Sequence, residues 1–108
     1  MIKVCAVDDI APGTAIGVEV EGVEVAVVRT EDGQVFAVHD VCSHAEVPLS
    51  EGEIDGCTVE CWLHGSRFDL RTGQPSGPPA TAPVPVYPVE IHEGDVYVSL
   101  APSNGVHP

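Results

Sequence analysis

CSHAEVPLSEGEIDGCTVECWLH, residues 42–64, is the most informative stretch of this chain because it holds two pairs of metal-type ligands. The first pair is Cys42 and His44, the second is Cys61 and His64, and sixteen residues separate the pairs. Thiolate sulfur favours iron–sulfur clusters, zinc or copper, and imidazole nitrogen suits iron and zinc. Glycine or proline lies close to each pair, so each is predicted to form a tight loop that offers two ligands to one metal site.

Alternating apolar residues on both sides of this stretch predict short β-strands. The expected strands cover residues 3–7, 14–21, 23–30, 34–40, 57–61, 66–70, 84–91 and 96–100. Ten prolines and eleven glycines punctuate the chain, which is typical of an all-β domain with many turns. The three strands between 14 and 40 should form an antiparallel meander. Pro85 and Pro88 predict an edge position or a bulge for their strand, and 101–108 is expected to be a frayed tail.

Length and charge narrow the class of protein. With 108 residues the chain is expected to form one domain, and its formal net charge is −13. Four basic residues against seventeen acidic ones exclude nucleic-acid binding, and an acidic membrane surface would repel the chain. No apolar run approaches the roughly 20 residues that span a bilayer. We therefore expect a cytoplasmic protein whose cysteines are metal ligands or buried thiols rather than disulfides.

C-S-H, sixteen further residues and then C-W-L-H-G-S-R-F-D-L-R-T-G resemble the cluster-binding signature of Rieske proteins. The resemblance covers most of the chain and implies a single all-β domain, 1–108. It implies an antiparallel β-sandwich with a cluster-binding subdomain of two loops, at about 41–76, at one end, and a proline segment, 77–83, covering that end. The implied cofactor is one 2Fe–2S cluster. One iron would be held by Cys42 and Cys61, and the other by His44 and His64.

Several positions depart from other Rieske proteins. Those of respiratory complexes carry a disulfide between the two loops, whereas Val47 and Leu63 stand at the comparable positions here. They also carry a tyrosine after the second loop, where this chain has Phe68, and the lost hydrogen bond implies a lower reduction potential. Ser66 matches the family serine and could donate to a cluster sulfide. Trp62 replaces the usual proline, and it either packs as a lid on the loop or forms part of a docking surface.

The signature is most similar to the soluble ferredoxin of bacterial ring-hydroxylating dioxygenase systems. This implies an electron carrier, not a catalyst, that meets a flavin-dependent NAD(P)H reductase and a terminal aromatic-ring oxygenase transiently. One alternative is an accessory ferredoxin for iron–sulfur assembly or another oxygenase. A second alternative, from a different class, is a zinc-stabilised binding module that uses the same four ligands.

The remaining cysteines and histidines are interpreted as structural. Cys5 and Cys57 are expected to be small buried residues in strands, because a ligand at Cys57 in place of Cys61 would spoil the Cys-x-x-His spacing. His39 and His92 are interpreted as strand residues, His92 directly after the predicted strand 84–91, and His107 as a tail residue. No pair of them has the spacing of a second metal site.

Overall fold

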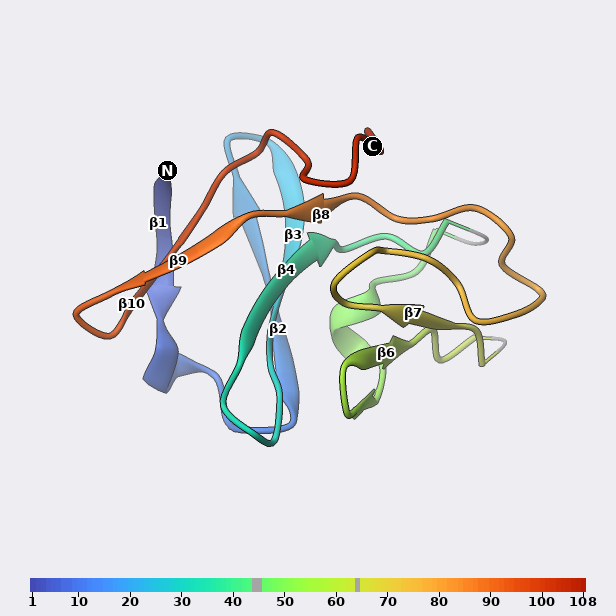
Figure 1. The fold of residues 1–108 in the computed structure, drawn as a ribbon, viewed down its shortest axis with the longest axis horizontal. Coiled ribbons are helices and arrows are strands. Elements are labelled where there is room, and N and C mark those ends of the chain that lie inside the picture. Colours follow the sequence, from blue (N-terminus) through green and yellow to red (C-terminus); the bar gives the residue numbers. More distant parts are fainter. Residues whose placement is uncertain (44–45, 64) are drawn as a thin grey trace.

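The computed structural model describes residues 1–43, 46–63 and 65–108, which form three antiparallel sheets (Figure 1). The first sheet has the order β1 (Ile2–Ala6), β10 (Asp95–Val98), β9 (Val89–His92). The second has the order β2 (Thr14–Val20), β3 (Val23–Arg29), β4 (Val35–His39), β8 (Val86–Tyr87). The third has the order β5 (Ile54–Asp55), β6 (Thr58–Glu60), β7 (Arg67–Asp69). Short 3-10 turns, η1 (Val7–Asp9) and η2 (Leu49–Glu51), join strands, and the all-β prediction is confirmed.

The central strand β3 is buried on both faces, which explains its nearly continuous apolar sequence. Val25 and Val27 belong to a core that they share with residues of the first sheet. Ala26 and Val28 belong to a second core on the opposite face. Because successive side chains of a strand point to opposite faces, one strand supplies both cores. The second sheet therefore forms the middle layer of the molecule, as Figure 1 shows for β2, β3 and β4.

The second core joins the middle layer to the third sheet, and it contains two of the four cysteines. Its buried members are Ala26, Val28, Val38, Cys42, Leu49, Val59, Cys61, Phe68, Leu70, Ala80, Val84 and Val86. Phe68 is the largest side chain in it, with no exposed surface. The apolar face of the third sheet is thus covered by the middle layer, which fixes the end of the molecule that carries the two ligand-type loops.

The single strand predicted over 84–91 is wrong, because the chain divides there into β8 and β9. Pro88 lies between the two strands and has no N–H to donate to a ladder. β8 ends the second sheet and β9 ends the first, so the edge position predicted from the prolines is confirmed for both. Cys57 was also expected in a strand but lies in the turn between β5 and β6.

The frayed tail predicted for 101–108 is wrong as well. The N–H of Ser103 donates to the carbonyl of Val86 at 2.8 Å, and the Asn104 side chain bonds several backbone groups. In Figure 1 this last segment runs beside β8 and ends over the middle of the molecule. Residues 101–108 have no periodic pattern from which this docking could be inferred.

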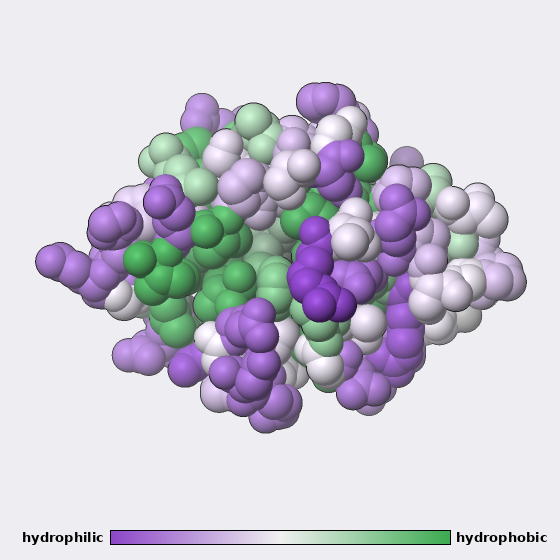
Figure 2. Space-filling view, in the orientation of Figure 1, coloured by the Kyte–Doolittle hydropathy of each residue, from purple (hydrophilic) through white to green (hydrophobic). Residues whose placement is uncertain are grey.

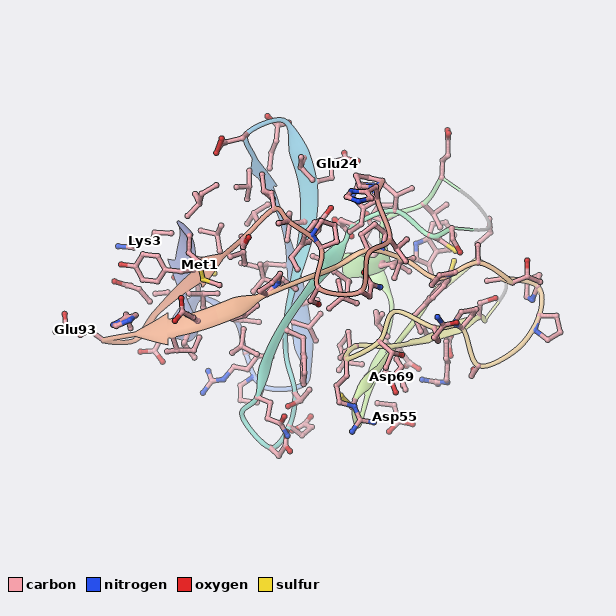
Figure 3. All side chains as sticks on the ribbon, turned by 45° about the horizontal axis from the view of Figure 1, so that its top comes forward. Met1, Lys3, Glu24, Asp55, Asp69 and Glu93 are labelled. Atoms are coloured by element: carbon pink, nitrogen blue, oxygen red, sulfur yellow. The ribbon has the colours of Figure 1, made fainter. Side chains whose placement is uncertain are left out.

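Acidic side chains cover much of the surface. Figure 2 shows hydrophilic residues over most of one face, with an apolar area toward the end built from β1, β9 and β10. In Figure 3, Lys3 and Glu93 lie at that end, whereas Asp55 and Asp69 lie on the third sheet. Among the described residues, no helix is long and apolar enough to cross a membrane.

Candidate metal centre

Cys42 and Cys61 lie where two strands give way to loops. Cys42 follows β4 and is 3% exposed, and Cys61 follows β6 and is 1% exposed. Both side chains pack into the same buried core, although eighteen residues separate them in the sequence. The fold thus brings together two of the four residues that the sequence singled out.

Both loops are closed by a hydrogen bond of the same span. The N–H of Cys42 donates to the carbonyl of Val47 at 3.0 Å, and the N–H of Cys61 donates to the carbonyl of Ser66 at 2.6 Å. Each bond joins a cysteine to the residue five positions later. In the second loop Gly65 has a φ of 77°, a conformation that glycine adopts at little cost. Two loops of equal length therefore begin at the two buried sulfur atoms.

His44 and His64 lie outside the described residues. In the sequence each falls inside one of the two hydrogen-bonded loops, between the cysteine and the residue that closes the loop. Their assignment as ligands stays a prediction.

A third segment, 72–84, reaches both loops. The Ser43 hydroxyl donates to the carbonyl of Ala82 at 2.6 Å, and the N–H of Ala80 donates to the buried Oγ of Ser66 at 3.1 Å. Ala80 and Val84 are buried in the core that contains both cysteines. The proline-containing segment is thus tied to each cysteine loop by one side chain. Ser43 was missed by sequence reasoning, because a single serine beside a cysteine carries no distinctive signal.

The base of the first loop is held by a carboxylate that the sequence analysis did not identify. Asp40 accepts hydrogen bonds from the backbone N–H of Ser50 at 2.7 Å and from its hydroxyl at 2.8 Å. A Cβ at Gly17 would lie 2.7 Å from an Asp40 carboxylate oxygen, so a larger residue at this position would displace the carboxylate. The end of β4 and the turn η2 are joined here, and Cys42 lies between them.

Trp62 and Phe68 have opposite environments. Trp62 is 49% exposed and its neighbour Leu63 is 42% exposed, whereas Phe68 is completely buried. The exposed half of the indole is available to a partner and the other half is covered by the chain, so the lid and the docking interpretations of Trp62 both stay predictions. Phe68 contributes its ring to the core beneath the cysteines and offers no hydrogen-bond donor.

The other two cysteines are poor candidates for ligands of this site. Cys57 is half-buried at the far end of β6, four residues from Cys61, which in extended chain amounts to about 13 Å between Cα atoms. Burial raises the pKa of the Cys57 thiol. Burial, with the carboxylates of Asp9 and Asp95, raises the pKa of Cys5. Cys5 packs against the other core, which contains neither Cys42 nor Cys61.

The described donor set fits a cluster with sulfur ligands. Two thiols share one core from which water is excluded, and the only buried polar or charged side chains in the described ranges are Thr30 and Ser66. A low-charge environment of this kind suits a cofactor that must bind by thiolates and remain protected from solvent.

Comparison with known proteins agrees with this reading of the site. Residues 1–88 match the Rieske 2Fe-2S domain. Ferredoxin CarAc of Metapseudomonas resinovorans is 44% identical over 99 residues, which cover 91% of this chain and 92% of that protein. The biphenyl dioxygenase ferredoxin subunit of Pseudomonas sp. strain KKS102 is 43% identical over 100 residues, covering 92% and 91%.

A solved structure is similar over nearly the whole chain. It is the complex of reduced oxygenase and oxidised ferredoxin in carbazole 1,9a-dioxygenase, with a TM-score of 0.83 and 44% identity, covering 91% of this chain and 100% of that one. The family match and these relatives also identify the cofactor, which is one 2Fe–2S cluster. The chain belongs to the family of Rieske 2Fe–2S domains.

Proposed function

We propose that this chain is a one-electron carrier between an NAD(P)H-dependent flavoprotein reductase and a terminal oxygenase that hydroxylates aromatic rings. Relatives are named as ferredoxin components of biphenyl, p-cumate and naphthalene dioxygenase systems, which supports this assignment. The chain is an electron-transfer component and not the catalyst. The observation that carries the proposal is the burial of Cys42 and Cys61 in one core, at the start of two loops closed alike.

The proposed ligand set places two thiolates on one iron and two imidazoles on the other. Cys42 and Cys61 supply the sulfur atoms, and His44 and His64 supply the nitrogen atoms. The cluster, when bound, accepts and releases one electron. Because neutral imidazoles bring no negative charge, an added electron meets less repulsion than in a site of four thiolates, and the reduction potential is higher.

Residues around the ligands adjust that potential. The Oγ of Ser66 accepts the N–H of Ala80, so the serine's own hydrogen is directed to a different acceptor. We assign this acceptor as a cluster sulfur, whose negative charge the hydroxyl would stabilise after reduction. Phe68 has no hydroxyl to add a second bond. The expected potential is therefore low for a Rieske centre but higher than that of an all-cysteine ferredoxin.

Partner proteins are proposed to dock on the end that carries the two loops. Trp62 and Leu63 are exposed there, and Pro78 and Pro79 of the segment that is bonded to both loops are exposed as well. An apolar surface next to the ligands lets a partner approach closely, and aromatic residues are frequent anchors in interfaces. The acidic remainder of the surface would steer a basic partner toward this end.

Variants of the four cysteines test the ligand set. Cys42→Ser and Cys61→Ser should lose the red-brown colour, whereas the matched controls Cys5→Ser and Cys57→Ser should keep it. Electron paramagnetic resonance of the dithionite-reduced protein should show a histidine-ligated 2Fe–2S cluster, and His44→Ala or His64→Ala should remove that signal. A spectrum of the all-thiolate type, or loss of the cluster in Cys57→Ser, would overturn the assignment.

The same measurements separate the alternatives. A zinc-stabilised module would be colourless and would not respond to dithionite. A carrier for iron–sulfur assembly or another oxygenase would show the same spectrum, but it would not support turnover when mixed with an aromatic-ring oxygenase and its reductase. Our proposal includes a cytoplasmic location and a single domain, 1–108. The confinement of the third sheet to residues 54–69 supports a cluster-binding subdomain at about 41–76.

A further inference from the structure

The side chain of Asn104 joins three segments of the chain. Its Nδ2 donates to the carbonyl of Thr72 at 3.0 Å and to the carbonyl of Val84 at 2.9 Å. Its Oδ1 accepts the N–H of Val86 at 3.2 Å and the N–H of Val106 at 3.3 Å. A carboxamide has two N–H donors and two acceptor sites, so this side chain makes every hydrogen bond open to it.

Thr72 and Val84 are the two ends of the segment that reaches both cysteine loops. The N–H of Val84 also donates to the carbonyl of Gly73 at 2.9 Å, so the segment is closed at its base like a large turn. A Cβ at Gly73 would overlap the Val84 carbonyl oxygen and lie 2.7 Å from the Asn104 Nδ2. The backbone at Gly73 and the backbone at Val84 thus approach as closely as glycine permits, and Asn104 bonds the chain on both sides of this contact.

Beyond this base the segment lies against the proposed cluster site. Ala80 donates to the Oγ of Ser66, and Ala82 accepts from Ser43, so each cysteine loop has one contact with the segment. In Figure 1 the segment between β7 and β8 runs around the end of the molecule that lies away from β1, β9 and β10. A displacement of its base would be passed on to the Ser66 hydroxyl and to Ala80 and Val84, which are buried in the core that contains both cysteines.

We propose that Asn104 is a positioning residue for the cluster, which acts by clamping both ends of segment 72–84 over the two cysteine loops. The side chain of Asn104 bonds the backbone of Thr72, Val84, Val86 and Val106, and its effect on the cluster passes through Ala80 and Ser66. The inference rests on the proposed ligand set. It assigns to the C-terminal tail a role in setting the environment of the cluster.

Two substitutions of Asn104 distinguish the two hydrogen bonds that its side chain donates from the two that it accepts. Asn104→Ala removes all of them. Asn104→Asp keeps a nearly identical shape and still accepts from Val86 and Val106, but it cannot donate to Thr72 and Val84, whose carbonyls its carboxylate repels. Ser103→Ala is the matched control, because it removes one bond between the tail and Val86 and leaves the clamp intact.

Hydrogen–deuterium exchange of the loaded protein, read by mass spectrometry, measures the clamp directly. Loss of two bonds that close the segment should make the amides of Ala80 and Val84 exchange about tenfold faster in both Asn104 variants. Ser103→Ala should leave these two amides unchanged. The amide of Val106 should stay protected in Asn104→Asp and lose protection in Asn104→Ala.

The paramagnetic spectrum and the reduction potential separate positioning from mere stabilisation. Both Asn104 variants should shift the g values and the midpoint potential of the cluster, or lose the cluster while the circular dichroism of the fold is retained, and Ser103→Ala should do neither. Spectra and Ala80 exchange equal to those of Ser103→Ala would overturn the proposal, even if overall stability fell. A wild-type protein without a histidine-ligated cluster signal would instead overturn the proposed function.

Discussion

Phe68 is the residue at which we expect a substitution to change the reduction potential most directly. It is completely buried in the core that contains Cys42 and Cys61. In Phe68→Tyr, a phenol hydroxyl that donates to a ligand sulfur would stabilise the reduced state. If this hydrogen bond stabilises the reduced state by roughly 1.4 kcal/mol, the midpoint potential rises by about 59 mV for one electron. Protein-film voltammetry should show a rise in midpoint potential of roughly this size. An unchanged or lower potential would contradict the assigned position of Phe68.

His39 gives a second prediction for a single residue. It ends β4, its Nδ1 lies 3.4 Å from the Tyr87 hydroxyl, and burial lowers its pKa although Glu24 and Asp40 oppose the shift. The unfolded chain, with a histidine pKa of about 6.5, therefore takes up this proton at higher pH than the folded protein. The stability that His39 contributes is complete above the unfolded pKa of about 6.5. It is lost as the pH falls from there through the lower pKa of the folded protein.

Urea unfolding of the wild type and His39→Gln at pH 7.5 and pH 5.5 measures this effect. The carboxylates titrate in both proteins, so the difference between the two pH dependences isolates the histidine. The midpoint of the wild type should fall more steeply on acidification than that of His39→Gln. Parallel curves for the two proteins would show that the half-buried imidazole does not contribute.

At the scale of elements, a side chain closes the base of two of the three segments that approach the proposed cluster. Asn104 does so for 72–84, and Asp40 does so for the first loop through its two bonds to Ser50. Ordering a long loop costs conformational entropy, and an irregular segment lacks the regular hydrogen bonds of a strand. A side-chain hydrogen bond at its base supplies part of the missing stabilisation. Neither residue belongs to a periodic pattern, so neither was expected from the sequence.

Asp40→Ala should destabilise the junction between β4 and η2. It removes two hydrogen bonds to a charged acceptor, and we expect a loss of roughly 2–3 kcal/mol in the free energy of unfolding from urea titration. Ser50→Ala keeps the backbone bond and should cost about 1 kcal/mol. If Ser50→Ala were as costly as Asp40→Ala, the backbone bond would have no measurable role in the junction.

At the scale of the whole molecule, charge and apolar contact should make separable contributions to partner docking. A net charge of −13 predicts that the rate of electron transfer to the oxygenase falls with added salt, since charges are screened over about 8 Å at physiological ionic strength. Trp62→Ala should lower this rate about tenfold at every salt concentration without changing the salt dependence. Stopped-flow absorbance of the cluster measures both quantities.

Ile91→Ala is the matched control for that prediction. Ile91 is 46% exposed, close to the 49% of Trp62, but it lies on β9 in the first sheet, whereas Trp62 belongs to the second cysteine loop. Its removal should leave the rate unchanged. An equal loss in the two variants would show that general surface apolarity, and not the place of Trp62, is responsible.

The sequence by itself determined the all-β class, most strands and the two loops with their cysteines. Strand alternation depends on neighbours two residues apart, and ligand spacing depends on a few consecutive residues, so both can be read locally. The division of 84–91 into two strands of different sheets, the docking of the tail by Asn104 and the contacts of Ser43 and Asp40 were decided only by the tertiary structure. These features depend on hydrogen bonds between segments far apart in the chain, and no local pattern specifies which carbonyl an amide or a hydroxyl will meet.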